Sequence, residues 1–157
     1  MRYGLLALVL IAATPSIARA DATAFLGRNS AGNDRGVTRG FAFGVSLLVV
    51  GFEFEYANSN EDLTDGTPSL RTTSGNVFVQ TFGLPGFQLY ATTGGGIYRE
   101  KLANDEETAF LLNNGGGIKI TLAGPIRARV DYRVFTLKGH PRHSTVQRIY
   151  AGVNVSF

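Results

Sequence analysis

The chain ends on Tyr150-Ala151-Gly152-Val153-Asn154-Val155-Ser156-Phe157, a segment in which polar and apolar residues alternate. Successive side chains of an extended strand point to opposite faces, so one face carries Ala151, Val153, Val155 and Phe157. Terminal residues of a soluble domain usually fray. The closing strand of a membrane barrel instead pairs with the first strand and turns its apolar face to lipid. The segment therefore predicts a closing barrel strand.

The other end of the chain has the features of an export signal. Met1-Arg2 is a short positive start, residues 5–13 are apolar, and Ala18-Arg19-Ala20 is a small-x-small cleavage site. The apolar run is shorter than the roughly 20 residues that a spanning helix needs. We expect a cleaved signal peptide at residues 1–20, rather than an anchor helix, and one mature domain at residues 21–157.

Composition excludes several classes of protein. The chain has no cysteine, so no disulfide framework is possible. Arg2 and Arg19 leave with the predicted signal, and the remaining thirteen basic residues nearly balance the twelve acidic ones. That balance gives no electrostatic case for binding nucleic acid, which needs a concentrated basic face. After the signal, no apolar run is long enough for a transmembrane helix.

The mature sequence reads as strands and loops. Eight strand-like runs cover residues 22–27, 40–47, 51–57, 75–84, 87–99, 109–122, 126–137 and 146–157. Three short links, at residues 48–50, 84–86 and 123–125, alternate with four long polar ones at residues 28–39, 58–74, 100–108 and 138–145. Short turns on one side and long loops on the other are typical of outer-membrane barrels. The facing of the run 75–84 stays open, because Val77 and Val79 oppose Phe78 and Phe82.

Charged residues occupy one face of several of these runs. Phe52, Phe54 and Tyr56 alternate with Glu53 and Glu55, and the run 126–137 has the same pattern. The predicted lumen charge network consists of Glu53, Glu55, Lys119, Arg127, Arg129, Asp131 and Arg133. Alternation alone does not separate a membrane barrel from a soluble barrel with its apolar row inside. The terminal aromatic residue, the loop asymmetry and the small residues on the polar rows favour the membrane barrel.

The signal, the eight alternating runs and the terminal pattern together resemble the small outer-membrane β-barrel family of the OmpA/OmpX type. The terminal pattern is Tyr150-x-Gly152-x-x-Val155-x-Phe157. The resemblance implies an all-β fold, an eight-stranded antiparallel up-and-down transmembrane barrel. It also implies a bacterial outer-membrane location and insertion by the barrel assembly machinery, with Tyr150, Gly152, Val155 and Phe157 as the assembly signal. The family is functionally mixed, so no single activity follows.

Other candidate sites are weak. The glycine triplets at residues 94–96 and 115–117 lack the Gly-Lys-Ser/Thr of a phosphate loop, and residues 58–65 match no calcium loop. We therefore expect no metal and no cofactor. His143 and Ser144 are adjacent and would point apart on a strand, and neither they nor His140 has a carboxylate nearby in sequence, so we expect no catalytic residues. Lys138, Arg142 and Arg148 are expected to contact lipopolysaccharide phosphates.

These observations predict a monomeric, non-enzymatic outer-membrane barrel with a structural or surface-displaying role. Its lumen would be plugged by ion pairs, and its partners would be outer-membrane lipid and lipopolysaccharide, with no nucleic acid. Three alternatives remain: a narrow pore for small solutes, a lipid-modifying enzyme that uses His140, His143 or Ser144, and a soluble lipocalin-like binder.

Overall fold

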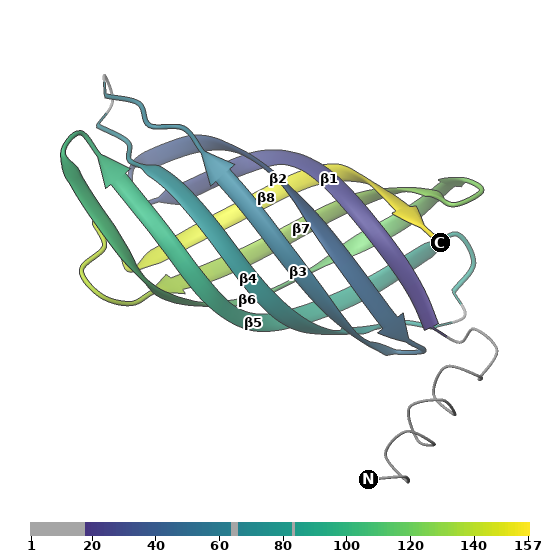
Figure 1. The fold of residues 1–157 in the computed structure, drawn as a ribbon. Coiled ribbons are helices and arrows are strands. Elements are labelled where there is room, and N and C mark those ends of the chain that lie inside the picture. Colours follow the sequence, from purple (N-terminus) through teal and green to yellow (C-terminus); the bar gives the residue numbers. More distant parts are fainter. Residues whose placement is uncertain (1–17, 64–65, 83) are drawn as a thin grey trace, which may run out of the picture.

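The computed structural model describes residues 18–63, 66–82 and 84–157, and they form a closed antiparallel barrel (Figure 1). Each strand pairs with the next one along the chain, and β8 closes the barrel against β1. The predicted all-β, eight-stranded fold is confirmed. The strands are β1 (Ala18–Ala31), β2 (Asp34–Leu47), β3 (Val50–Ser59), β4 (Ser69–Gln80), β5 (Phe87–Leu102), β6 (Asp105–Ala123), β7 (Ile126–Leu137) and β8 (Thr145–Ser156).

Most of the predicted signal peptide, residues 1–17, lies outside the described residues. The three residues of the predicted cleavage site begin β1. There the Ala20 amide donates to the Phe157 carbonyl, and the Phe157 amide donates to the Ala20 carbonyl, both at 2.9 Å. The last residue of the chain is thus held by the first strand. Within the described ranges, no helix has the length and hydrophobicity to cross a membrane.

The barrel wall separates apolar from polar residues. Phe52, Val130 and Val153 are 63%, 42% and 53% exposed on the outside. The next residue along the strand in two of these cases, Glu53 and Asp131, is buried inside. This facing follows from the two-residue period of a strand. It is the reverse of a lipocalin-like binder, whose apolar rows would pack in a dry centre.

The two ends of the barrel differ. The turn end carries the short links, at Leu48–Val49, residues 81–86 and Gly124–Pro125, and the last residue, Phe157. The loop end carries tight hairpins at residues 32–33 and 103–104 and longer loops at residues 60–68 and 138–144. The predicted long loops at 28–39 and 100–108 are therefore wrong, because β1, β2, β5 and β6 extend through these polar segments. Backbone pairing continues there although the residues no longer alternate between apolar and polar.

The structure settles the facing of β4, which spans Ser69–Gln80 rather than the predicted 75–84. Phe78 points inward and is buried, while Val77 and Val79 are exposed outside. Gly51 is the register partner of Phe78 on β3. A Cβ at Gly51 would overlap the Phe78 ring, so the glycine provides the space that lets this aromatic side chain enter a polar lumen.

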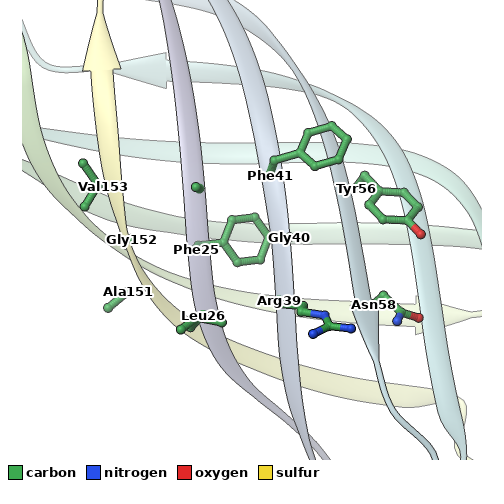
Figure 2. A pocket seen from close by; sticks show the side chains of 11 residues that line it. Phe25, Leu26, Arg39, Gly40, Phe41, Tyr56, Asn58, Ala151, Gly152 and Val153 are labelled. Atoms are coloured by element: carbon green, nitrogen blue, oxygen red, sulfur yellow. The ribbon is translucent and has the colours of Figure 1, made fainter.

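A shallow groove of about 720 Å³ crosses the outer wall over β8, β1, β2 and β3 (Figure 2). Small residues leave the backbone uncovered along its floor, chiefly Ala24, Gly40 and Ala151. Arg39 and Asn58 pair with each other two residues nearer the loop end than the pair Phe41 and Tyr56. They therefore lie at the loop-end edge of the groove. The outer wall is therefore not uniformly apolar.

Candidate functional site

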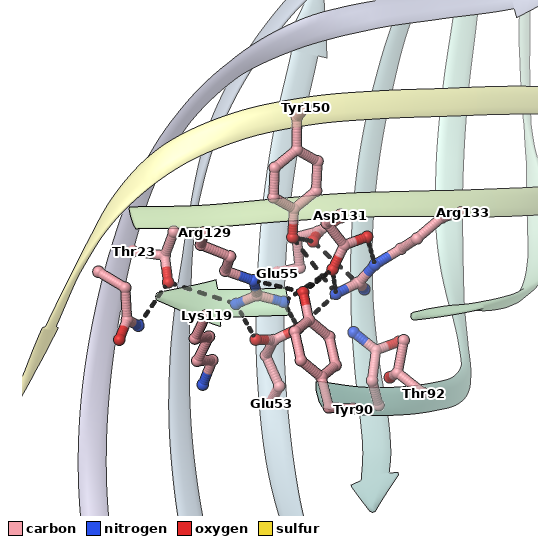
Figure 3. A network of polar contacts seen from close by, with 12 residues as sticks. Thr23, Glu53, Glu55, Tyr90, Thr92, Lys119, Arg129, Asp131, Arg133 and Tyr150 are labelled. Atoms are coloured by element: carbon pink, nitrogen blue, oxygen red, sulfur yellow. Dashed lines mark hydrogen bonds and ion pairs between the residues drawn. The ribbon is translucent and has the colours of Figure 1, made fainter. Parts of the chain in front are cut away.

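The middle of the lumen holds a compact network of ion pairs (Figure 3). The Glu53 carboxylate on β3 forms ion pairs with two arginines of β7, with Arg129 Nη1 at 2.5 Å and with Arg133 Nη2 at 2.6 Å. Asp131, between the two arginines on β7, receives Arg129 Nη2 and Arg133 Nε, each at 3.0 Å. Every charge is therefore shared between two partners. Buried ions need this degree of pairing to offset their lost hydration.

A second carboxylate, Glu55, extends the network toward the loop end. Its Oε2 lies 3.2 Å from Arg133 Nη1, and its Oε1 lies 3.1 Å from Arg148 Nη1. Arg148 also donates to Asn29 at 2.8 Å and to Thr72 at 3.0 Å. The prediction that Arg148 contacts lipopolysaccharide is thus wrong. Arg148 has 0% exposure, because it shares the inward row of β8 with Tyr150.

Two tyrosines complete the network, and sequence reasoning did not include them among the lumen residues. The Tyr90 hydroxyl donates to the Asp131 carboxylate and accepts from Arg129 Nε at 2.7 Å. The Tyr150 hydroxyl donates to Glu55 Oε2 at 3.2 Å. Strand parity was the available signal, because Tyr150 alternates with the apolar row of β8. A phenol fits this position because its ring fills space while its hydroxyl satisfies a buried charge.

Lys119 and Arg127 occupy the turn end of the lumen. Lys119 Nζ pairs with Asp21 at 2.5 Å and lies 5.5 Å from the Phe78 ring centre. Arg127 also faces inward but is only half-buried, and its Nη1 contacts the Gln88 amide oxygen at 3.4 Å. The structure thus brings six of the seven predicted lumen charges into ion pairs and places Arg127 outside that set.

The buried charges balance. The carboxylates of Asp21, Glu53, Glu55 and Asp131 are matched by Lys119, Arg129, Arg133 and Arg148. Ion pairs of this kind hold the strands across the lumen rather than along the wall, because β3 and β7 lie on opposite sides of the barrel. These pairs have the chemistry of a plug in the middle of the lumen, and the half-buried Arg127 at the turn end stays outside them.

A second, apolar layer fills the lumen on the loop side of the charges. Its members all point inward and are buried: Leu70, Tyr98, Leu111, Phe135, Leu137 and Val146. The Arg148 guanidinium lies 4.4 Å from the Phe135 ring centre, so the two layers are in direct contact. Sequence reasoning missed this layer because it assumed that the inward rows stay polar along their whole length.

Carboxylates fasten the loop 138–144 over the loop end. Asp34 Oδ2 lies 3.1 Å from both Arg142 Nε and His143 Nε2. Glu100 accepts the Arg142 backbone amide at 2.9 Å. No carboxylate lies near His143 along the chain, because Asp34 belongs to β2 and is 109 positions away. Lys138 in the same loop is exposed.

The described residues do not assemble a catalytic triad or a metal site. The hydroxyl of Ser144 makes no hydrogen bond to His140 or His143 within the described part of the chain. The same residues contain no group of three or more His, Cys, Asp and Glu side chains that could hold a metal ion. The His143–Asp34 pair therefore lacks an adjacent nucleophile in this arrangement.

The residues of the terminal pattern at positions 150–157 alternate between the lumen and the outer wall, as a strand requires. Tyr150 is buried inside and stacks on Phe25 with ring centres 4.0 Å apart. Gly152 also points inward, where a Cβ would collide with the Phe25 side chain. Phe157 is exposed at the turn end. These placements describe the motif in the folded barrel, and its role in assembly remains a prediction.

Comparison with solved structures identifies similar barrels. Neisserial surface protein A matches with a TM-score of 0.72 and 15% identity over 90% of this chain and 98% of that one. The N-terminal β-barrel domain of Pseudomonas aeruginosa OprF matches with a TM-score of 0.69 and 18% identity over 88% and 97%. The outer-membrane enzyme PagL matches with a TM-score of 0.54 and 11% identity over 86% and 98%. No family model matches, and a search of curated protein sequences found no match. The likeness shows a shared fold.

Proposed function

We propose that this protein is a monomeric, non-enzymatic barrel of the bacterial outer membrane that does not conduct solutes and displays its loop end at the cell surface. The largely apolar outer rows support the membrane location, because lipid is the solvent that they match. The similarity in fold to outer-membrane barrels also supports it.

The filled lumen is the observation that carries the proposal. The ion-paired layer contains Arg129, Asp131 and Arg133, each no more than 1% exposed. The apolar layer above it contains Leu111 at 1% and Phe135 at 0%. A solute would have to separate paired charges and then cross a dry layer. Both steps are unfavourable, because broken buried pairs and lone ions among apolar groups lack solvation.

Two partners belong to this proposal. The outward terminal residues Val155 and Phe157 are available to the barrel assembly machinery before the barrel closes. Lipopolysaccharide is the expected neighbour of the loop end, where Lys138 and Arg142 are exposed. Arg142 is already partly neutralised by Asp34, so Lys138 is the freer of these two cations.

Conductance in planar bilayers tests the proposal. The full chain, purified from outer membranes, should insert without producing stable current steps. A matched variant with Leu111→Ala and Phe135→Ala truncates two of the six side chains of the apolar layer and leaves the residues of the ion pairs unchanged. It should show short openings, because the layer is part of the seal. Stable openings of the unmodified protein would support a narrow pore instead. An unheated sample that migrates differently from a boiled one checks that the barrel is folded.

A lipid-modifying enzyme is the second candidate, and the His143–Asp34 contact of 3.1 Å is the observation that favours it. A carboxylate beside an imidazole can orient a general base. A triple variant with alanine in place of His140, His143 and Ser144 tests the enzymatic alternative. If the lipid A profile of cells that express this triple variant equals that of cells with the unmodified chain, the enzymatic alternative is lost.

A further inference from the structure

Charged residues on the outer wall are unevenly distributed. Among outward-facing strand positions of the described residues, the basic ones are Arg28, Arg35, Arg39, Arg71, Arg99 and Lys101, and the acidic one is Glu106. All of them lie in the loop-end halves of their strands. The outward positions between them and the turn end are uncharged. This wall therefore has an apolar band with basic residues along one border.

Four of these five arginines have no carboxylate partner in the described residues, and Arg35 is one of them. Arg99 pairs with Glu106 at 3.2 Å on the outer surface. Arg28, Arg39 and Arg71 are exposed, and in the described part of the chain none of them forms an ion pair. An unpaired guanidinium beside an apolar band attracts an anion, because it keeps its proton and acyl chains do not solvate it.

Strand register brings these arginines together. Arg39 on β2 pairs with Asn58 on β3, which pairs with Arg71 on β4. Arg28 on β1 pairs with Val37, two positions from Arg39, so Arg28 and Arg39 are diagonal neighbours within reach of long side chains. We call Arg28, Arg39, Asn58 and Arg71 the arginine patch. Its three guanidinium groups and one amide face outward from four neighbouring strands.

The groove on the outer wall runs from this patch toward the turn end. Figure 2 shows Arg39 and Asn58 at one edge of the groove, and Phe41, Tyr56 and Val153 toward the other. Its lining includes the small residues Ala24, Gly40 and Ala151, and its volume is about 720 Å³. A ligand that fits both parts has an anionic head and an acyl tail.

We propose that the arginine patch and the groove form a binding site for a phosphorylated lipid of the outer leaflet, the lipid A part of lipopolysaccharide. The phosphates of lipid A contact the patch, where guanidinium groups donate paired hydrogen bonds to phosphate oxygens. One acyl chain lies in the groove over Ala24 and Gly40. The inference rests on the membrane location of the proposed function but not on the closed lumen. It moves the lipopolysaccharide contact from Arg148 to the outer wall.

Native mass spectrometry of the full chain in detergent, with added bisphosphorylated lipid A, measures this site. The unmodified barrel should retain one lipid A molecule. Replacing Arg28, Arg39 and Arg71 by Gln should weaken retention by about a hundredfold, since several charge-assisted hydrogen bonds are lost. Arg99→Gln is the matched control, because that arginine already pairs with Glu106, and it should change retention by less than about threefold.

Two further arms identify the ligand. Ala151→Phe fills the groove and keeps the patch, and it should weaken retention of lipid A by about tenfold through the acyl chain alone. Inorganic phosphate should fail to displace the lipid. Four results would each overturn the site. The triple variant could retain lipid A as well as the unmodified barrel, or Arg99→Gln could lose as much lipid A as the triple variant. Ala151→Phe could retain lipid A fully, or inorganic phosphate could displace it.

The folding of each variant and the cellular location of the protein are measured separately from lipid retention. Each variant must show the same heat-dependent gel mobility as the unmodified barrel, which confirms that the wall is intact. A protein that fractionates with soluble contents would overturn the membrane location and this site with it. A protein that lies in the outer membrane and folds but retains no lipid A would overturn this site alone.

Discussion

The Arg129 guanidinium holds the Glu53 carboxylate from the opposite wall of the barrel through two contacts, Nη1 to Oε2 at 2.5 Å and Nη2 to Oε1 at 3.2 Å. The two residues come from β7 and β3, which are separated by three strands on either side of the closed sheet. A planar guanidinium and a planar carboxylate fix each other's orientation in this arrangement. The pair therefore braces the barrel across its width.

Removing the Glu53 charge should strongly destabilise the barrel. In Glu53→Gln, Arg129 would keep Asp131 as its carboxylate partner, Arg133 would keep Asp131 and Glu55, and one positive charge would be left uncompensated in the lumen. Breaking a buried pair from one side costs about 3–5 kcal/mol. Urea unfolding in lipid vesicles measures the change. Asp105→Asn, at an exposed hairpin, is the control and should lie close to the unmodified protein; a Glu53→Gln barrel with unchanged stability would show that the brace contributes nothing.

Arg148 and Arg142 should respond very differently to the same substitution. Arg148→Gln removes a buried charge from Glu55, Asn29 and Thr72, and the expected loss is about 3 kcal/mol or more. Arg142→Gln removes a partly exposed pair with Asp34, which keeps His143 as a neighbour, and should cost less than about 1 kcal/mol. Equal effects of the two substitutions on the unfolding midpoint would contradict the buried placement of Arg148.

Much of the fold could be predicted from the two-residue period. The alternation of Phe52 and Phe54 with Glu53 and Glu55, and of Val130 with Arg129 and Asp131, fixes which side of the wall each residue faces. The same rule applied to β8 would have placed Arg148 beside Tyr150 in the lumen. That error came from reading a basic residue near a loop as a surface residue, although its partner Glu55 is far away along the chain.

Other features depend on contacts that no local pattern contains. Phe78 enters the lumen because Gly51 on the neighbouring strand leaves space for its ring. The hairpins at residues 32–33 and 103–104 extend beyond the apolar band, where pairing with the neighbouring strand rather than hydrophobic alternation keeps the backbone extended. The His143–Asp34 contact joins residues that lie 109 positions apart.

Glycine at position 117 should be required by the packing of Tyr90. A Cβ there would overlap the Val130 carbonyl oxygen and would lie 2.6 Å from the Tyr90 hydroxyl oxygen, which binds Asp131 and Arg129. Both the wall backbone and the tyrosine would have to move. We expect Gly117→Ala to cost about 1–3 kcal/mol, as for other overpacked sites. Gly75→Ala is the matched control on the outer wall, where a Cβ meets nothing within 4 Å. A destabilised Gly75→Ala with a tolerated Gly117→Ala would reverse this account of the lumen.

The most direct test concerns what the outer rows touch. The chain has no cysteine, so single cysteines at Val130, Val153 and Lys138 can carry a spin label in the barrel reconstituted into lipid vesicles. The measurement is the rate at which the spin label collides with a relaxing agent. Oxygen concentrates in acyl chains and should collide more often with labels at Val130 and Val153. A water-soluble nickel complex should collide more often with the label at Lys138. If the nickel complex reached Val130 and Val153 as readily as Lys138, the apolar wall would face water and the membrane barrel would be contradicted.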